Sequence, residues 1–300
     1  MAARTDLPDD LAETVARALC EDLGDGDKTA AILPAESTAS ARIVSGDSGT
    51  LCGQPWFDEV FRQLDPAVSV HWSLPEGGNM RAGQRVCRLE GPAHALLSGE
   101  RTALNFLQTL SAVATTCQRY ADRIKGTRAR ILDTRETLPG LRSAQKYAVR
   151  IGGCENHRHG LFDAILIQAN HIAAAGSIAA AAELARRLYP NAPIEIEVQN
   201  LDQMEQALHA RAERVLLSAF PSHLLARAAH MAARHRRFNL GDVRLEASGD
   251  IDLSNVRDVA DAGVDFISVA RLTKDIQAVP MTMRFDERTG PASADARRGR

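Results

Sequence analysis

The N-terminal part of the chain changes from a helical to a strand-like pattern of apolar residues and back again. Over residues 11–23 the apolar positions recur at helical spacing and Gly24 follows them, which predicts a helix that stops at this glycine. Residues 39–90 contain short alternating runs separated by glycine or proline and predict a small β-sheet. Helical spacing returns over residues 95–125, without proline, and predicts one or two helices that link two domains.

Beyond Gly126 the pattern becomes cyclic, because strand-like runs alternate with helical stretches. Six such units follow one another, each of about 20 to 30 residues, and this repetition implies parallel strands joined by right-handed crossovers. The strands are predicted to begin near Arg130, Asp163, Ile194, Arg214, Val243 and Asp265, and the helices to cover residues 142–149, 171–188, 201–210, 222–236 and 253–262.

The repeated units predict a closed or nearly closed (β/α) barrel. Polar residues end every predicted strand, and the strand ends of such barrels form the mouth in which active sites are built. An open doubly wound sheet is the alternative, but no Gly-x-Gly-x-x-Gly motif follows the first strand. We therefore expect two domains, at residues 1–115 and 116–279, with residues 280–287 as a candidate return to the first domain and residues 288–300 as a disordered tail.

Composition and charge limit the class of protein. The formal net charge of −2 does not favour nucleic acid or an anionic membrane as a partner. No apolar run approaches the roughly 18 to 20 residues that a membrane-spanning helix needs, and the acidic residues near the N-terminus argue against a secretory signal. The five cysteines are scattered and odd in number, as expected for free thiols. We expect a soluble, cytoplasmic protein.

Two glutamates share one face of a single predicted strand. In residues 194–198 aliphatic residues alternate with Glu195 and Glu197, so the two carboxylates point to the same side. Inside a barrel they would be costly to bury unless a cation, a metal or a ligand hydroxyl meets them. Glu197 is nearer the end of the strand and is the candidate functional carboxylate. For Glu195 we expect a structural ion pair with an interior arginine.

Cationic residues gather next to the predicted strand ends. Arg135 follows the first strand, Arg158 precedes the second, and Arg101 lies in the helix before the barrel. Arginine suits carboxylates and phosphates, because its planar group forms two parallel charge-assisted hydrogen bonds. His157 is a candidate general acid or base, or a hydrogen-bond donor to an anion, and the alternative for it is a satisfied structural residue. Together these residues predict a local anion site.

Seven motifs recur here in the order in which they occur in a known family. They are residues 21–29, 99–108, Asp133-Thr134-Arg135 through Arg142, residues 146–150, Asn156-His157-Arg158, residues 195–198 and residues 245–249. By these motifs and their order, the sequence resembles the quinolinate phosphoribosyltransferases. The resemblance extends from about Glu21 to Phe285.

The resemblance implies both a fold and a reaction. The fold is α/β, with an N-terminal α/β sandwich-like domain and a C-terminal incomplete (β/α) barrel of the type II phosphoribosyltransferase kind. The implied assembly is a homodimer or larger homo-oligomer in which the active site is shared between subunits. The implied activity, a pentosyltransferase step of NAD biosynthesis, joins quinolinate to phosphoribosyl diphosphate with Mg²⁺ and yields nicotinate mononucleotide, diphosphate and carbon dioxide. An aromatic dicarboxylate and phosphoribosyl diphosphate are then the small-molecule partners.

The resemblance also implies roles for single residues. By position, the residues that would bind quinolinate are Arg101 of the partner subunit, Arg135, His157 and Arg158. His157 and Glu197 would be catalytic residues, and Glu197 would face the metal. Ser248 and Gly249 would bind phosphate, and Gln168, Ser218 and Ala270 lie at further substrate-binding positions.

The sequence departs from the family's pattern on the phosphate side of this site. Glu136 and Gln168 stand where the family typically has lysine, Ser218 where it has an acid, Asp250 and Ala270 where it has glycine, and Ala169, Gln199 and Ala219 where polar or acidic residues are usual. We expect Glu136 and Asp250 each to weaken binding of phosphoribosyl diphosphate by on the order of a few kcal/mol when desolvated.

Two alternatives to the family reaction follow from these departures. One is a paralogue that keeps the dicarboxylate pocket but performs another reaction, such as decarboxylation without ribosyl transfer. The other is a non-catalytic binding or regulatory protein.

Overall fold

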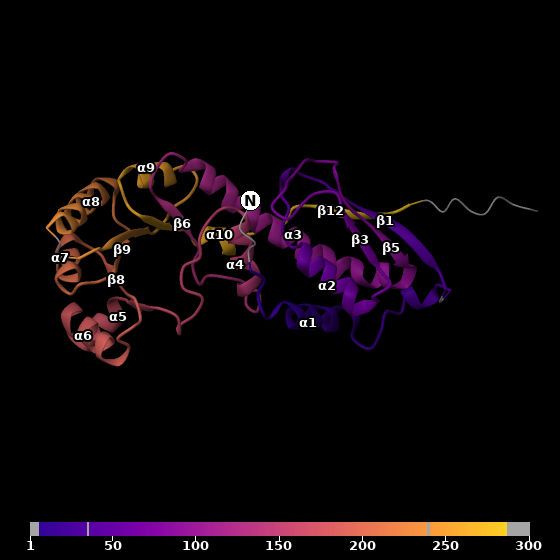
Figure 1. Ribbon diagram of the computed structural model, residues 1–300, viewed down its shortest axis with the longest axis horizontal. Helices are drawn as coiled ribbons and strands as arrows, with labels where there is room; N and C mark the ends of the chain where they lie inside the picture. Colours follow the sequence, from indigo (N-terminus) through magenta and orange to yellow (C-terminus); the bar gives the residue numbers. More distant parts are fainter. Residues whose placement is uncertain (1–5, 35, 239–240, 287–300) are drawn as a thin grey trace, which may run out of the picture. The chain divides into compact units, whose positions relative to one another are not determined.

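The computed structural model describes residues 6–34, 36–238 and 241–286, which form two compact units (Figure 1). Of the described residues, one unit comprises Leu7–Ala112 and residues 277–286, and the other comprises Val113–Ile276 together with Asp6. The boundary lies inside the long helix α3, Ala93–Arg123, so this helix contributes to both units. The tail predicted at residues 288–300 lies outside the described residues.

The first unit is built on an antiparallel sheet of four strands in the order β12-β1-β5-β3. These strands are β1 (Thr38–Ser45), β3 (Ser69–Trp72), β5 (Arg85–Pro92) and β12 (Met281–Phe285), and a separate short pair joins β2 (Gly49–Thr50) to β4 (Asn79–Met80). Strand β12 pairs with β1 from Ala41↔Phe285 to Ser45↔Met281. The chain therefore returns to this unit after the barrel.

Helices α1 (Leu11–Leu23) and α2 (Gln54–Leu64), with the short 3-10 turn η1 (Ala30–Ile32), complete this unit. Helix α1 has the predicted bounds, whereas the pattern of residues 39–90 predicted only strands and missed α2. Phe57 of α2 contacts Phe61 and Trp72 with ring centroids 5.2 Å apart in each pair. A side chain at Gly99 would come within 2.6 Å of Phe61, which explains this glycine in the interior of α3.

The second unit contains the six predicted strands and their helices. The strands are β6 (Arg130–Leu132), β7 (Ile165–Ile167), β8 (Ile194–Val198), β9 (Arg214–Ser218), β10 (Arg244–Ser248) and β11 (Phe266–Ser268). The helices are α4 (Arg142–Ile151), α5 (Ala169–Ala175), α6 (Ile178–Leu188), α7 (Leu201–His209), α8 (Ser222–Arg237), α9 (Val256–Asp261) and α10 (Arg271–Lys274).

The strand order is that of an incomplete barrel. The order is β6-β11-β10-β9-β8-β7 with every pair parallel, so the first strand of the unit pairs with the last. Strands β6 and β7 are at the two ends of this order and are not paired in the described residues; Leu132 of β6 instead forms an isolated parallel bridge with Glu155, in the segment before β7. Helices α7, α8 and α9 lie outside the strands (Figure 1). The predicted barrel is confirmed, and the open doubly wound sheet is wrong.

One predicted helix is interrupted. The stretch at residues 171–188 forms two helices, because Gly176 adopts a φ of 88° and the hydroxyl of Ser177 then accepts the amide of Ala180 as the cap of α6. Within residues 6–34, 36–238 and 241–286 no helix is both long and apolar enough to cross a membrane.

The carboxyl ends of the parallel strands meet at one end of the barrel. There Ser218 and Ser248 are register partners on β9 and β10, and the amide of Ala219 donates to the carbonyl of Ser248 at 2.8 Å. Ala219 and Gly249 have φ values of 55° and 144°, and a Cβ on Gly249 would lie 3.3 Å from the Cα of Ala219. The two loops after these strands are therefore packed closely together, and the second requires a glycine.

Candidate active site

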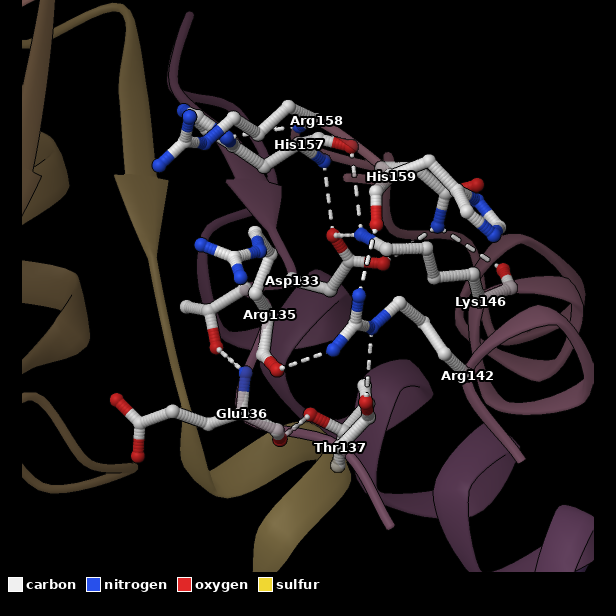
Figure 2. Close-up of polar contacts among 12 residues, drawn as sticks. Asp133, Arg135, Glu136, Thr137, Arg142, Lys146, His157, Arg158 and His159 are labelled. Carbon is white, nitrogen blue, oxygen red and sulfur yellow. Dashed lines mark hydrogen bonds and ion pairs between the residues drawn. The ribbon is translucent and has the colours of Figure 1, made fainter. Parts of the chain in front are cut away.

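Two guanidinium groups lie at the mouth of the barrel. Arg135 follows β6 and Arg158 precedes β7 (Figure 2). The buried Nε of Arg135 has no hydrogen-bond partner among the residues that the structure describes. Burial lowers the pKa of Arg158 and the positive charge of Arg135 lowers it further, against the opposing effect of Glu195 and Asp163. Arg158 donates from Nη1 to the carbonyl of Ala164 at 3.4 Å. Two half-buried cations, one of them with an unfilled buried donor, favour an anion between or beside them.

The turn that carries Arg158 is built on Asp133. The carboxylate of Asp133 accepts hydrogen bonds from Lys146 at 2.5 Å, the side chain of Asn156 at 2.6 Å and the amide of His157 at 2.8 Å (Figure 2). Asp133 and Lys146 are 0% and 2% exposed. Burial raises the pKa of Asp133 and lowers that of Lys146, while each charge opposes the shift of the other. These two motif residues form the buried ion pair that holds the turn.

Arg142, on α4, forms hydrogen bonds to the residues around Arg135 and Arg158. These bonds occupy its guanidinium group, so in this arrangement it is not free to bind a ligand. Its guanidinium donates to the carbonyls of Arg135 at 3.4 Å and His159 at 3.2 Å, and to the hydroxyl of Thr137 at 3.1 Å (Figure 2).

The ring of His157 faces the barrel interior. Its Nε2 lies 2.8 Å from Oε2 of Glu195 and 3.5 Å from Oε2 of Glu246, and Nη1 of Arg214 lies 2.9 Å from the same oxygen of Glu246. Its Nδ1 accepts the amide hydrogen of Arg158 at 2.7 Å. Both ring nitrogens lie at hydrogen-bond distance from protein groups in this structure, and the direct action of His157 on a ligand stays a prediction.

The protonation of this ring follows from its neighbours. Burial opposes a charge on His157, whereas the hydrogen bonds and charges of Glu195 and Glu246 favour one and raise its pKa. A proton on Nδ1 would nevertheless face the Arg158 amide hydrogen across 2.7 Å, so we assign the single ring proton to Nε2. Burial and the charge of Glu246 also raise the pKa of Glu195, whereas the hydrogen bond from His157 opposes that shift.

Glu197 is held by a neutral neighbour. Its Oε2 accepts a hydrogen bond of 2.8 Å from the side-chain amide of Gln168, which stands at the end of β7. Ser218 ends the next strand, and within the described parts of the chain neither its hydroxyl nor that of Ser248 makes a hydrogen bond. Among the residues that the structure describes at the ends of β7, β8, β9 and β10, this edge of the mouth therefore has one carboxylate, two hydroxyl groups without a hydrogen bond, and no cation.

Glu136 and Asp250, the two acidic residues that depart from the family's pattern, each have a cationic partner on α10. Glu136 pairs with Lys274 at 2.9 Å, and Asp250 pairs with Arg271 at 2.9 Å, close to Ala270 at the start of this helix. All four side chains are between 46% and 90% exposed. The repulsion expected from Glu136 and Asp250 is therefore partly neutralised, and both cations remain exchangeable because exposed ion pairs contribute little.

The residues here fit a resident Mg²⁺ site poorly. Mg²⁺ demands near-octahedral oxygen ligands and is usually held by one or two carboxylates together with substrate phosphates. Glu197 is the single carboxylate at the described ends of β7, β8 and β9, and one of its oxygens already accepts the Gln168 amide.

The structure brings together some of the predicted residues and separates others. Arg135, His157 and Arg158 form one group, Gln168 and Glu197 form a second, and Ser218, Ser248 and Gly249 lie on two neighbouring loops. Arg101 is exposed on α3 in the other unit, so its predicted role in a partner's site stays a prediction.

Sequence reasoning missed four residues of this region: Arg214, Glu246, Arg271 and Lys274. A signal for Glu246 existed, because it alternates with aliphatic residues in β10 as Glu195 does in β8.

The fold and the mouth together define a (β/α)-barrel protein with two guanidinium groups, those of Arg135 and Arg158, beside the carboxyl ends of its strands. The N-terminal domain of the quinolinate phosphoribosyl transferases matches residues 27–111, and the C-terminal domain of the same family matches residues 113–284. The chain belongs to the quinolinate phosphoribosyl transferase family.

Individual relatives cover almost the whole chain. The carboxylating nicotinate-nucleotide pyrophosphorylase of Mycobacterium leprae is 37% identical over 272 residues, which span 88% of this chain and 93% of the relative. The human carboxylating nicotinate-nucleotide pyrophosphorylase is 34% identical over 259 residues, 85% of each chain. The solved nicotinate-nucleotide pyrophosphorylase of Francisella tularensis has a TM-score of 0.87 and 38% identity, and the match covers 94% of this chain and 98% of that one.

Proposed function

We propose that this protein is an enzyme of the carboxylating nicotinate-nucleotide pyrophosphorylase type, which joins quinolinate to phosphoribosyl diphosphate in NAD biosynthesis. The observation that carries the proposal is the pair Arg135 and Arg158, two adjacent guanidinium groups with an unfilled buried donor at the barrel mouth. A planar molecule with two carboxylates matches two such groups, since each can form parallel charge-assisted hydrogen bonds. The match to this chain spans 93% of the length of the Mycobacterium leprae relative and 84% of the length of a second relative, from Synechocystis.

The chain's own residues would act chiefly by binding and orientation. Arg135 and Arg158 would hold the carboxylates of quinolinate, so that the ring nitrogen faces the ribose carbon of the second substrate. Attack by this nitrogen forms the bond to ribose and releases diphosphate. The resulting pyridinium accepts the electron pair left when the 2-carboxylate departs as carbon dioxide, and a proton then replaces it. Glu197 would stabilise positive charge at the ribose carbon.

Binding of the diphosphate is expected to be weak. Gln168 contributes no charge, and Arg271 and Lys274 must exchange their partners Asp250 and Glu136 for phosphate oxygens. Any Mg²⁺ would have to arrive with the diphosphate, and no step above depends on it. We further propose a cytoplasmic homodimer in which Arg101 reaches the site of the partner subunit.

A second candidate function is supported by the ion pairs of Glu136 with Lys274 and of Asp250 with Arg271. A paralogue that binds an aromatic dicarboxylate but does not use phosphoribosyl diphosphate would keep Arg135 and Arg158 and tolerate Glu136 and Asp250 at the phosphate edge. Such a protein would either catalyse another reaction of the dicarboxylate or bind it without catalysis.

Two titrations separate these functions. Isothermal calorimetry with quinolinate tests the guanidinium pair, and a second titration with phosphoribosyl diphosphate and Mg²⁺, followed by chromatography of the products, tests the transfer. Formation of nicotinate mononucleotide supports the first function. Quinolinate binding without diphosphate binding supports the second, and failure to bind quinolinate or benzene dicarboxylates contradicts both.

A further inference from the structure

A buried group of ionisable side chains supports the barrel mouth from inside. This interior cluster comprises His157, Glu195, Glu246 and Arg214. Its contacts run from Arg214 to Glu246 at 2.9 Å, from Glu246 to His157 at 3.5 Å and from His157 to Glu195 at 2.8 Å. The guanidinium of Arg214 also lies 4.4 Å from the ring centroid of Phe266. Glu195 and Glu246 are only 6% and 1% exposed, so water contributes little to their stabilisation.

The cluster is connected to the ligand-binding face through the backbone. The amide of His157 donates to Asp133 at 2.8 Å, and the next amide, that of Arg158, donates to the ring of His157 at 2.7 Å. Two consecutive peptide groups are thus fixed by side chains. The direction in which Arg158 leaves the main chain therefore depends on where the His157 ring lies.

We propose that Glu195, Glu246 and Arg214 are positioning residues that fix the imidazole of His157, and through it the Arg158 guanidinium, for binding an aromatic dicarboxylate. The inference rests on the proposed function for the identity of the ligand. Its physical basis is that an arginine clamp binds well only when its group is held in place before the ligand arrives. A long, flexible side chain without this support would lose rotational freedom on binding.

A divalent metal is the competing explanation of this cluster. One ligand atom from each of His157, Glu195 and Glu246 lies within 4.8 Å of the others, as in a metal site. Two features favour a proton-bridged cluster instead. Glu246 already has a cationic partner in Arg214, and Nε2 of His157 lies at hydrogen-bond distance from Glu195.

The first test compares Glu246→Gln with Glu155→Gln, a control at an exposed glutamate paired with Arg130 on the same barrel. We expect Glu246→Gln to weaken quinolinate binding tenfold or more, as is common when a residue that orients a ligand-contacting group is replaced, and to leave the affinity for inorganic diphosphate unchanged. Glu155→Gln should change neither affinity. Unchanged quinolinate affinity in a folded Glu246→Gln variant would overturn the inference, as would an equal loss for both ligands.

The second test needs no variant and therefore stands even if Glu246→Gln fails to fold. Long-range ¹H–¹⁵N spectra of the intact protein should show His157 with a proton on Nε2 and none on Nδ1. A proton on Nδ1, or a stoichiometric metal in elemental analysis that shifts these signals on chelation, would overturn the inference. If the protein does not bind quinolinate at all, the proposed function fails, and the spectra still decide whether the cluster fixes the ring.

Discussion

The side-chain amide of Gln168 donates a hydrogen bond of 2.8 Å to the carboxylate of Glu197, across the ends of two neighbouring strands. A position where the resemblance implies a lysine is therefore occupied by a neutral donor that still orients the carboxylate. The orientation of Glu197 is retained without the positive charge that would attract a diphosphate.

The neutral pair Gln168 and Glu197 predicts that restoring the charged residues of the family's pattern increases activity with phosphoribosyl diphosphate. The triple variant Glu136→Lys, Gln168→Lys and Ser218→Asp should raise kcat/KM for phosphoribosyl diphosphate by tenfold or more, because each substitution recovers a charge that the family's pattern has. The KM for quinolinate should change little. Steady-state kinetics with each substrate varied in turn measures both effects. Gln206→Lys, on exposed α7, is the control for added charge, and an equal gain in that control would contradict the explanation.

The pair Asp250 and Arg271 predicts a separable effect on phosphate. Asp250→Gly should improve the binding of ribose 5-phosphate several-fold, because it removes a carboxylate beside Gly249 and frees a guanidinium. The free energy of unfolding should change by less than about 1 kcal/mol, since the pair is exposed. Fluorescence-detected thermal shifts with and without ribose 5-phosphate report both quantities. Asp261→Asn, which removes a similar exposed pair on α9, should leave the phosphate affinity as it is.

Arg158 should matter through its shape as well as its charge. Arg158→Ala should weaken quinolinate binding by about 1.5 to 3 kcal/mol, the usual range for a hydrogen bond to a charged group. Arg158→Lys should recover only part of this loss, because an ammonium group cannot form two parallel hydrogen bonds to one carboxylate. Calorimetric titration measures the affinities. Arg150→Lys, on the exposed face of α4, serves as the control, and full recovery by lysine at position 158 would argue against a bidentate contact.

The buried pair Asp133 and Lys146 predicts a large loss of stability. Asp133→Asn should lower the free energy of unfolding of the barrel unit by about 3 to 5 kcal/mol, because it leaves a buried ammonium without its counter-charge. Urea unfolding followed by circular dichroism measures the loss. Asp122→Asn, which removes an exposed pair with Lys125, should cost less than about 1 kcal/mol. Similar losses in the two variants would be inconsistent with the assigned role of Asp133.

Asp58 in the first unit predicts a pH-dependent stability. Burial, and to a smaller degree Glu76, raises its pKa to about 6 from an ordinary 3.8, although the Trp72 indole hydrogen bond opposes the shift. The folded protein therefore binds this proton more tightly than the unfolded chain, and stability decreases as the pH rises from about 4 through 6.

Asp58→Asn should consequently raise the thermal midpoint at pH 8 and leave it unchanged at pH 4. The gain should be below about 1 kcal/mol, because the side chain is partly exposed and solvent screens it. Differential scanning calorimetry at both pH values measures the effect. Asp47→Asn, at an exposed aspartate elsewhere in this unit, should show no such dependence. A gain of equal size at pH 4 would show that charge is not the cause.

Local periodicity predicted most of the elements. The strands that begin near Arg130, Ile194 and Arg214 start at these residues, because alternation and apolar runs are properties of neighbouring positions. Helix α2 was missed although Trp56, Phe57, Val60 and Phe61 form a buried helical face, since short apolar runs between glycines resemble strands. The barrel mouth was predictable in the same way, because parallel strands place their carboxyl ends together.

The sequence by itself determined the barrel, the family and the positions of Arg135 and Arg158 next to strand ends. Only the tertiary structure decided how charges are paired. Glu136 and Lys274 are 138 residues apart, and the ring of His157, in the loop before β7, turns toward carboxylates on β8 and β10. Coulomb interactions and hydrogen bonds depend on distance in space, which no local pattern along the chain contains.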